Sequence, residues 1–407
     1  MPSILDAGRF PSKSGGVSIT KHLIRNGIRQ MMDQTRKANS ADVVIVGGGP
    51  AGLAAAIALG QKGIECIVVE ALEPPIDKCC GEGLMPDALH SLKALGVKIR
   101  EEEGYAFQGI RFADSTHRVD ADFPNGAGIG VRRTHLHQRM SDRACEVGVR
   151  LMWGNRLTLL SQKEVMVNGV PTRFRWLIGA DGTASLVRRW AGLGAEKAFS
   201  QRVCFRRHYE TAPWSEYVEV HWGAIGQVYI TPVARDRVCV VFITRCGRVD
   251  REHFLNGFPE VTRKLVGAPI VTEGRGAVSV TRKLNRVANE TVALIGDASG
   301  SADAITGEGL AQSFRQAVAL AASIENGKLS DYNKAHRLIA RLPHAMASLM
   351  LTMDRWPAME KHGMRALASD TSFFEELLAV HMGMESLPSF ALRRGPSLGW
   401  RILFNHG

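Results

Sequence analysis

Short apolar runs that end at glycines or acidic residues dominate the pattern of the first half of the chain. Val43–Val46 leads into the glycine-rich stretch 47–52, and the alanine-rich apolar stretch Leu53–Leu59 follows at once. This order predicts a strand, a tight turn and a helix. Glu65–Val69 is predicted to be the next strand, and it ends at Glu70. The pattern is typical of an α/β domain with a parallel sheet.

Two later apolar runs end in the same way. Trp176–Ala180 precedes Asp181-Gly182, and Val292–Ile295 precedes Gly296-Asp297. A long helix is predicted over Ala311–Glu325, directly after the glycine-containing loop 307–310. These runs are therefore predicted to be further strands of the same parallel sheet, separated from the first two by long stretches of sequence.

A different, alternating pattern occupies the middle of the chain. Alternation of apolar and polar residues predicts antiparallel strands, and residues 196–280 show no alternation of helices with strands. The predicted strands are Phe107–Phe112, His117–Phe123, Tyr217–Trp222, Val228–Val233 and Arg237–Ile243. Residues 331–407 are rich in Leu and Met and are predicted to be helical.

These patterns predict an α/β protein in which a Rossmann-type dinucleotide-binding domain carries an inserted antiparallel-sheet substrate domain and a C-terminal helical segment. The nucleotide-binding domain is discontinuous, over 41–105, 130–195 and 281–330. The substrate domain takes 106–129 and 196–280. Residues 331–407 form the helical segment, and residues 1–40 form a basic extension that is expected to be flexible.

Composition narrows the class of protein. The 407-residue chain is 45% hydrophobic and 22% charged, which is typical of a globular protein with a sizeable core. Its net charge is +11, but the basic residues do not form a stripe interleaved with aromatic residues. We therefore expect no nucleic-acid partner. Seven cysteines without C-x-x-C spacing favour a reducing, cytoplasmic setting and argue against a metal site. No apolar run is long enough to span a membrane.

The N-terminal segment carries much of the charge. Residues 1–40 hold seven basic residues against two acidic ones, and 20–37 have helix-like apolar spacing. One interpretation is a solvated tail. The alternative is a peripheral contact with the anionic inner face of a membrane, because basic amphipathic segments bind such surfaces.

The first glycine motif indicates a site for a dinucleotide. Gly47 allows the tight turn, Gly49 lets a pyrophosphate approach the backbone, and Gly52 lets the helix pack on its strand. Pro50 and Ala51 place the helix N-terminus toward the anion. Glu70, at the end of the second strand, suits the ribose hydroxyls. The alternative is a glycine-rich turn in an unrelated α/β domain.

The three strand ends together resemble the fingerprint of FAD-dependent oxidoreductases of the para-hydroxybenzoate-hydroxylase fold. The resemblance covers roughly residues 41–330 and includes aromatic hydroxylases, geranylgeranyl reductases and halogenases. It implies that FAD contacts the glycine motif with Glu70, together with residues that follow later strands. These are Arg133, Asp181, Gly182, Asp297, Gly307, Gly309 and Leu310. Backbone N–H groups of that last loop would stabilise reduced flavin.

The loop Lys78–Pro86 resembles the Cys-Gly-x-Gly-Leu loop of the geranylgeranyl reductase branch, in which Cys80 is the matching cysteine. That branch also has an aromatic-rich strand. Its counterpart here is 226–232, where Tyr229 stands roughly at the position of a tryptophan. This departure from the pattern argues against prenyl-chain reduction. Packing is the alternative role for the loop cysteine.

The resemblance implies an NAD(P)H-dependent monooxygenase that hydroxylates a hydrophobic or aromatic secondary metabolite through a flavin C4a-hydroperoxide. Cys80, Tyr229 and His221 are the candidate catalytic residues, with His221 as a base for a phenol; a structural histidine is the alternative. One rival function is reduction of a prenyl or quinone lipid. Another is a non-catalytic flavin-binding protein.

Overall fold

The computed structural model describes residues 40–161, 163–194, 200–245 and 251–394. Within them, two seven-stranded sheets and one three-stranded sheet combine with helices, which confirms the predicted α/β architecture. None of the described helices is both long enough and apolar enough to cross a bilayer. The predicted basic helix at 20–37 lies outside the described residues.

The first sheet contains the strand that precedes the glycine motif. Its strands are β1 (Ser40–Val46), β2 (Cys66–Val69), β8 (Arg150–Met152), β9 (Leu157–Ser161), β10 (Glu164–Val167), β11 (Val170–Gly179) and β17 (Val292–Leu294). β1 pairs in parallel with β2 and β11, and β11 pairs in parallel with β17. The parallel strands put the ends of β1, β2, β11 and β17 at one edge, where the predicted cofactor residues follow. Helices α2 (Pro50–Gly60), α4 (Arg133–Glu146) and α8 (Gly309–Glu325) share one core with this sheet.

The second sheet forms most of the predicted substrate domain. Its strands are β5 (Gly109–Ala113), β6 (Arg118–Asp122), β12 (Ser200–Glu210), β13 (Tyr217–Gly223), β14 (Gly226–Ala234), β15 (Arg237–Thr244) and β16 (Arg275–Thr281). Two short helices that the sequence pattern did not predict, α6 (Arg251–Asn256) and α7 (Pro259–Leu265), lie between β15 and β16. Phe254, Phe258, Val261 and Leu265 recur at helical spacing and pack on one face of the sheet.

Short elements connect the two sheets. They are β3 (Gly83–Leu84), β4 (Gly104–Phe107), β7 (Gly128–Val131), α3 (Pro86–Ala94), α5 (Leu186–Trp190) and the 3-10 turns η1 (Glu101–Glu103), η2 (Gly296–Ser299) and η3 (Ala304–Thr306). The single strand predicted at Phe107–Phe112 is split, because β4 pairs with β7 whereas β5 pairs with β6 and β13. β4 therefore belongs to the small sheet, and β5 belongs to the large second sheet.

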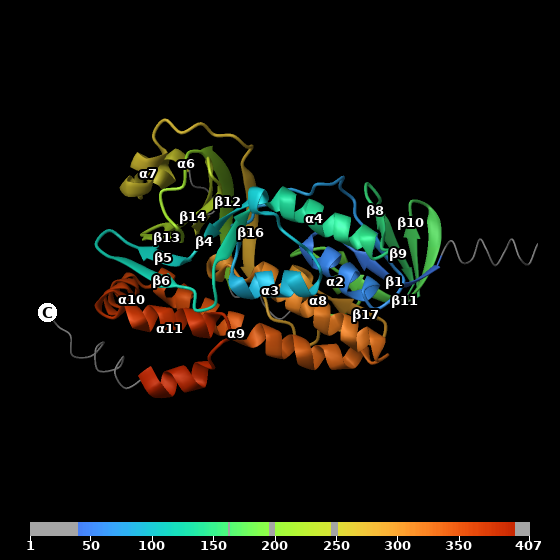
Figure 1. The fold of residues 1–407 in the computed structure, drawn as a ribbon. Coiled ribbons are helices and arrows are strands. Elements are labelled where there is room, and N and C mark those ends of the chain that lie inside the picture. The colour runs from blue at the N-terminus through green and yellow to red at the C-terminus, as the bar shows by residue number, and fades with distance from the viewer. Residues whose placement is uncertain (1–39, 162, 195–199, 246–250, 395–407) are drawn as a thin grey trace, which may run out of the picture.

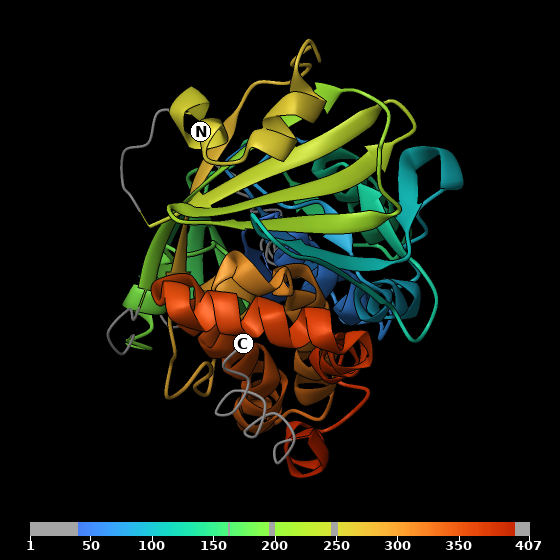
Figure 2. The ribbon, with the colours of Figure 1, turned by 90° about the vertical axis from the view of Figure 1, so that its left-hand side faces the viewer.

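Three helices follow the first sheet along the chain and pack on the second one. They are α9 (Leu329–Arg355), α10 (Pro357–Ser369) and α11 (Thr371–His381), and they confirm the helical prediction as far as the chain is described. Figure 1 shows them along one side of the molecule, and Figure 2 shows the second sheet above them. Phe374 and Leu378 of α11 join Phe112 and Val220 of the sheet in one buried cluster. The helices thus close the side of the sheet that α6 and α7 leave uncovered.

Candidate active site

A cavity of about 430 Å³ is lined by residues of the glycine motif, the second sheet and the C-terminal helices. Most of the predicted cofactor residues lie at one part of its wall. These are Gly49, Pro50, Ala51, Arg133, Gly182, Asp297, Gly307, Gly309 and Leu310. The fold therefore brings together residues that are up to 261 positions apart in the sequence, Gly49 and Leu310.

The three glycines of the motif differ in what surrounds them. Gly47 has a φ of +111°, and a side chain there would collide with the carbonyl of Ala180. A methyl group on Gly52 would collide with the carbonyl of Gly47. A methyl group on Gly49 would meet no atom within 4 Å and would stand in open space at the start of α2. That open space is where the resemblance places the pyrophosphate.

The donors around this space suit an anionic dinucleotide. α2 and α8 both begin at the cavity, and their first N–H groups are free to bind anions. The buried Nε atom of Arg133 has no hydrogen-bond partner in the structure. A buried guanidinium nitrogen without a partner is costly unless a ligand satisfies it. The residues present therefore fit FAD.

Four predicted cofactor residues lie behind the cavity wall. Gly47 and Gly52 shape the turn. Glu70 accepts hydrogen bonds from the backbone N–H groups of Gly48 (2.8 Å) and Leu72 (2.9 Å). Asp181 accepts three bonds at the start of α5, the shortest from the hydroxyl of Ser185 (2.5 Å). Asp181 thus caps a helix, and the cofactor contacts of Glu70 and Asp181 stay predictions.

The loop that carries Cys80 is fixed to the second sheet by a buried acid. Glu82 has a φ of +60° and is 2% exposed. Its carboxylate accepts hydrogen bonds from Arg206 Nη1 (2.8 Å) and lies 2.6 Å from His208 Nε2. Arg206 also binds Asp77, at the other end of the loop. Burial alone would raise the pKa of Glu82, but bonds from His208, Arg133 N–H and the Arg206 charge hold it below its ordinary value.

A potential metal-ligand set occurs within this network, although the sequence predicted none. Atoms of Glu82, His208 and Cys239 lie within 4.8 Å of one another, and all three residues are buried. The carboxylate, however, is already paired with Arg206 and His208. A guanidinium at 2.8 Å opposes a second cation at the same oxygen. We therefore interpret the set as a loop anchor.

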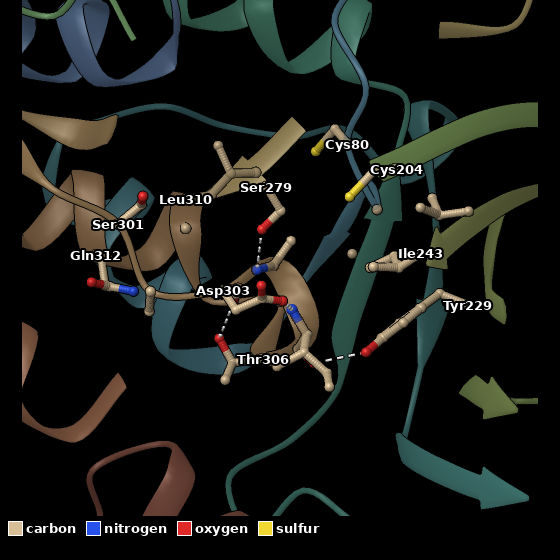
Figure 3. Close-up of a pocket in the computed structure, with 18 of the residues that line it drawn as sticks. Cys80, Cys204, Tyr229, Ile243, Ser279, Ser301, Asp303, Thr306, Leu310 and Gln312 are labelled. Carbon is tan, nitrogen blue, oxygen red and sulfur yellow. Dashed lines mark hydrogen bonds between the residues drawn. The ribbon is translucent and has the colours of Figure 1, made fainter. Parts of the chain in front are cut away.

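Cys80 lines the cavity, as predicted, together with Cys79 and Cys204. Figure 3 shows Cys80 and Cys204 on the same side of the cavity. Burial raises the pKa of Cys204 to about 11 and raises that of Cys79 further. Both of these thiols therefore stay protonated and act as apolar groups near pH 7. Cys80 Sγ accepts a weak bond from the N–H of Glu82 (3.4 Å).

Tyr229 also lines the cavity, and its hydroxyl donates to the carbonyl of Ile305 (2.8 Å), as Figure 3 shows. Burial raises its pKa far above the ordinary value, so it is a donor and not a base. The contact fixes η3 against β14. Tyr229 therefore positions the loop that precedes Gly307.

His221 is not among the described residues that line the cavity. His221 lies on β13, where successive side chains point to opposite faces of the sheet. Val218 and Val220 of the same strand line the cavity, so His221 points to the opposite face. Its Nε2 lies 2.9 Å from Glu219 Oε2, in a buried pair on the other face. We assign His221 no catalytic role, because the period of a strand turns its side chain away from the cavity.

The apolar part of the cavity wall comes from the C-terminal helices and the strands opposite them. Met346, Met350 and Met353 of α9 and Leu367, Phe374 and Leu378 of α10 and α11 face Ile110, Phe112, Val218 and Val220. Polar side chains gather where this part meets the cofactor residues, and Figure 3 shows Ser279, Asp303 and Thr306 there. One cavity thus has a cofactor part, a polar junction and an apolar part.

The family of the chain follows from its sequence. A family model described as "FAD binding domain" matches residues 40–326. The chain belongs to the FAD binding domain family. FAD is therefore the cofactor, as the resemblance implied, and the chain is an FAD-dependent oxidoreductase.

Proteins whose names give different reactions are similar to this chain. Menaquinone reductase of Mycolicibacterium smegmatis is 25% identical, with 78% of this chain and 86% of the relative covered. A 3-(3-hydroxy-phenyl)propionate/3-hydroxycinnamic acid hydroxylase of Mycobacterium sp. is 34% identical over 39% of this chain and 30% of the relative. The fold is similar to that of the flavin-dependent brominase Bmp2 (TM-score 0.72, 18% identity, 84% and 93% covered).

Sequence reasoning missed several side chains at the cavity or next to it. Glu82 is the unspecified residue x of the Cys-Gly-x-Gly-Leu motif, so the motif assigned it no role. Asp303 and Glu308 lie in the segment after Gly296-Asp297, but nothing in the local pattern shows that they are buried (both 1% exposed). His381 lies beyond the residues matched by the family model. Only the packing of α11 against η3 brings it to the site.

Proposed function

We propose that the protein is an NAD(P)H-dependent FAD monooxygenase that hydroxylates a hydrophobic or aromatic small molecule. The observation that carries this proposal is that the cofactor part and the apolar part belong to one cavity of about 430 Å³. A pocket lined mostly by apolar side chains, with a few polar groups, is typical of sites for small organic ligands. The hydroxylase relative supports the reaction.

The arrangement of the wall favours an amphipathic substrate. Ser279, Asp303 and Thr306 would lie near its polar group, and its apolar part would lie between the second sheet and α9–α11. The methionines of α9 suit this purpose, because their flexible side chains adapt to irregular apolar shapes. Bound FAD would supply the redox chemistry, while these residues orient the substrate and exclude water.

Reduction of a carbon–carbon double bond is the second candidate. The Cys80 loop lines the cavity and is anchored by Glu82, which supports a likeness to the reductase branch. The menaquinone reductase relative covers more of the chain than the hydroxylase relative does. The apolar part of the cavity suits either substrate.

Turnover with isotopically labelled dioxygen separates the two reactions. The FAD-loaded protein is incubated with NADPH or NADH and 4-dodecylphenol, a probe with a polar ring and an apolar chain. We expect the probe to accelerate NAD(P)H oxidation and to gain one labelled oxygen atom. An anaerobic incubation with menaquinone tests the reductase: a product with two hydrogens added across a double bond of its prenyl chain, and no added oxygen, would favour it and contradict hydroxylation. If neither product forms, both candidate reactions are contradicted.

A further inference from the structure

A buried group of ionisable side chains lies between the apolar part of the cavity and the molecular surface. Glu308, just before α8, is 1% exposed and lies between two glycines that line the cavity. His381, at the end of α11, lines the cavity itself. Arg315 of α8 and Asp87 of α3 complete the group. No function described above uses it.

The contacts of Glu308 within the group are longer than hydrogen bonds. Glu308 Oε2 lies 3.8 Å from His381 Nδ1, and Glu308 Oε1 lies 3.6 Å from Arg315 Nη2. Neither carboxylate oxygen of Glu308 has a hydrogen-bond partner, although both are buried. Buried polar atoms without partners are rare in proteins, so the two oxygens of Glu308 call for an explanation.

The orientation of the imidazole leaves one nitrogen for exchange. His381 Nε2 lies 3.2 Å from the carbonyl of Thr306, which can only accept a hydrogen bond. Nε2 therefore carries a proton in both charge states, and Nδ1 is the nitrogen that gains or loses one. Nδ1 is the atom that faces Glu308.

The charges of the group favour one mobile proton. Two carboxylates and one guanidinium leave a single negative charge, which a proton on either Glu308 or His381 neutralises. Burial raises the pKa of the Glu308 carboxyl; His381 and Arg315 oppose this rise, and Asp87 adds to it. Groups coupled in this way titrate as a unit.

We propose that Glu308 and His381 share one exchangeable proton and pass it between the cavity and solvent, as the acid or base of the reaction proposed above. This inference rests on the proposed function. In hydroxylation of a phenol, the substrate O–H bond breaks, its electron pair stays on oxygen, and an N–H bond forms at His381 Nδ1. Glu308 then takes that proton from the imidazolium and releases it to solvent beside Arg315, which is 31% exposed.

Nuclear magnetic resonance tests the shared proton without a substrate. The FAD-loaded protein, labelled at the histidine ring carbons, is titrated with acid as wild type, Glu308→Gln and Glu219→Gln. We expect Glu308→Gln to move the midpoint of the His381 resonance, because the negative charge that faces Nδ1 is lost. Glu219→Gln, which alters another buried His–Glu pair, should leave that midpoint unchanged. A His381 midpoint that Glu308→Gln does not move would overturn the proposal.

Kinetics test the role of the pair in turnover. With 4-dodecylphenol and NADPH, His381→Gln should slow product formation about 100-fold, the scale of general acid–base catalysis, and change its pH profile. His221→Gln, a buried histidine away from the cavity, should retain the wild-type rate and profile. A wild-type pH profile and rate in His381→Gln would overturn the catalytic role. A wild type that does not turn over the probe counts against the proposed function, whereas the resonance titration still decides the shared proton.

Discussion

Replacing Glu82 with glutamine is expected to lower the free energy of unfolding by about 3–5 kcal/mol. The carboxylate is the buried partner of Arg206 and His208, and its loss leaves a 1%-exposed guanidinium with only Asp77. Removing one member of a buried ion pair usually costs this much, because the other charge stays in the interior. Urea unfolding of both proteins measures the difference.

A matched control separates this effect from the loss of any acidic side chain. Glu164 pairs with Arg173 at 3.8 Å on the surface, and Glu164→Gln should change stability by less than about 1 kcal/mol. Glu82→Gln should also make Cys80 react faster with a thiol reagent, because the Cys80 loop loses its anchor. Equal stability of the two variants would contradict the role of Glu82 as the anchor of the Cys80 loop.

Gly49→Ala is expected to abolish tight FAD binding without unfolding the protein. A methyl group on Gly49 meets nothing in the protein, and the residue has an ordinary extended backbone, so the fold can accept it. The same methyl would enter the space where the pyrophosphate must approach the backbone. We expect at least about a tenfold loss of affinity, which corresponds to about 1.4 kcal/mol. Flavin fluorescence during titration of the FAD-free protein measures it.

Gly52→Ala provides the contrasting result. Its methyl would collide with the carbonyl of Gly47, so this variant should lose stability even without FAD. Thermal unfolding of the FAD-free proteins should leave Gly49→Ala close to wild type and shift Gly52→Ala downward. Wild-type FAD affinity in Gly49→Ala would show that the cofactor does not lie where the glycine motif places it.

The cofactor half of the site could be predicted from the sequence because its signals are local. Gly47, Gly49 and Gly52 satisfy backbone requirements that a short stretch of chain encodes by itself. The strand before them is a continuous apolar run, which identifies a buried parallel strand. Asp297 and Gly309 follow the same logic at another strand end of the same sheet, and the cavity confirms that these segments meet.

The substrate half could not be predicted because its contacts are between distant segments. His221 and Val220 are neighbours in the sequence, yet only register with β14, where Val220 pairs with Tyr229, shows which one faces the cavity. The helices α6 and α7 were not predicted, because the alternating pattern of the strands is the stronger signal in this region. Their apolar residues pack on the face of the second sheet that is turned away from the cavity. His381 reaches the site only through the packing of α11.

The proposed function requires that FAD and the substrate share one cavity, and the absorbance spectrum of bound FAD reports whether they do. Adding 4-dodecylphenol to the FAD-loaded protein should perturb the flavin bands in a saturable way, because the probe would lie in the same cavity as the ring system. Leu378→Trp, which fills the apolar part, should weaken the response, whereas Leu338→Trp, at a 64%-exposed position of α9, should not. A flavin spectrum that does not respond, or that responds equally in all three proteins, would contradict the claim.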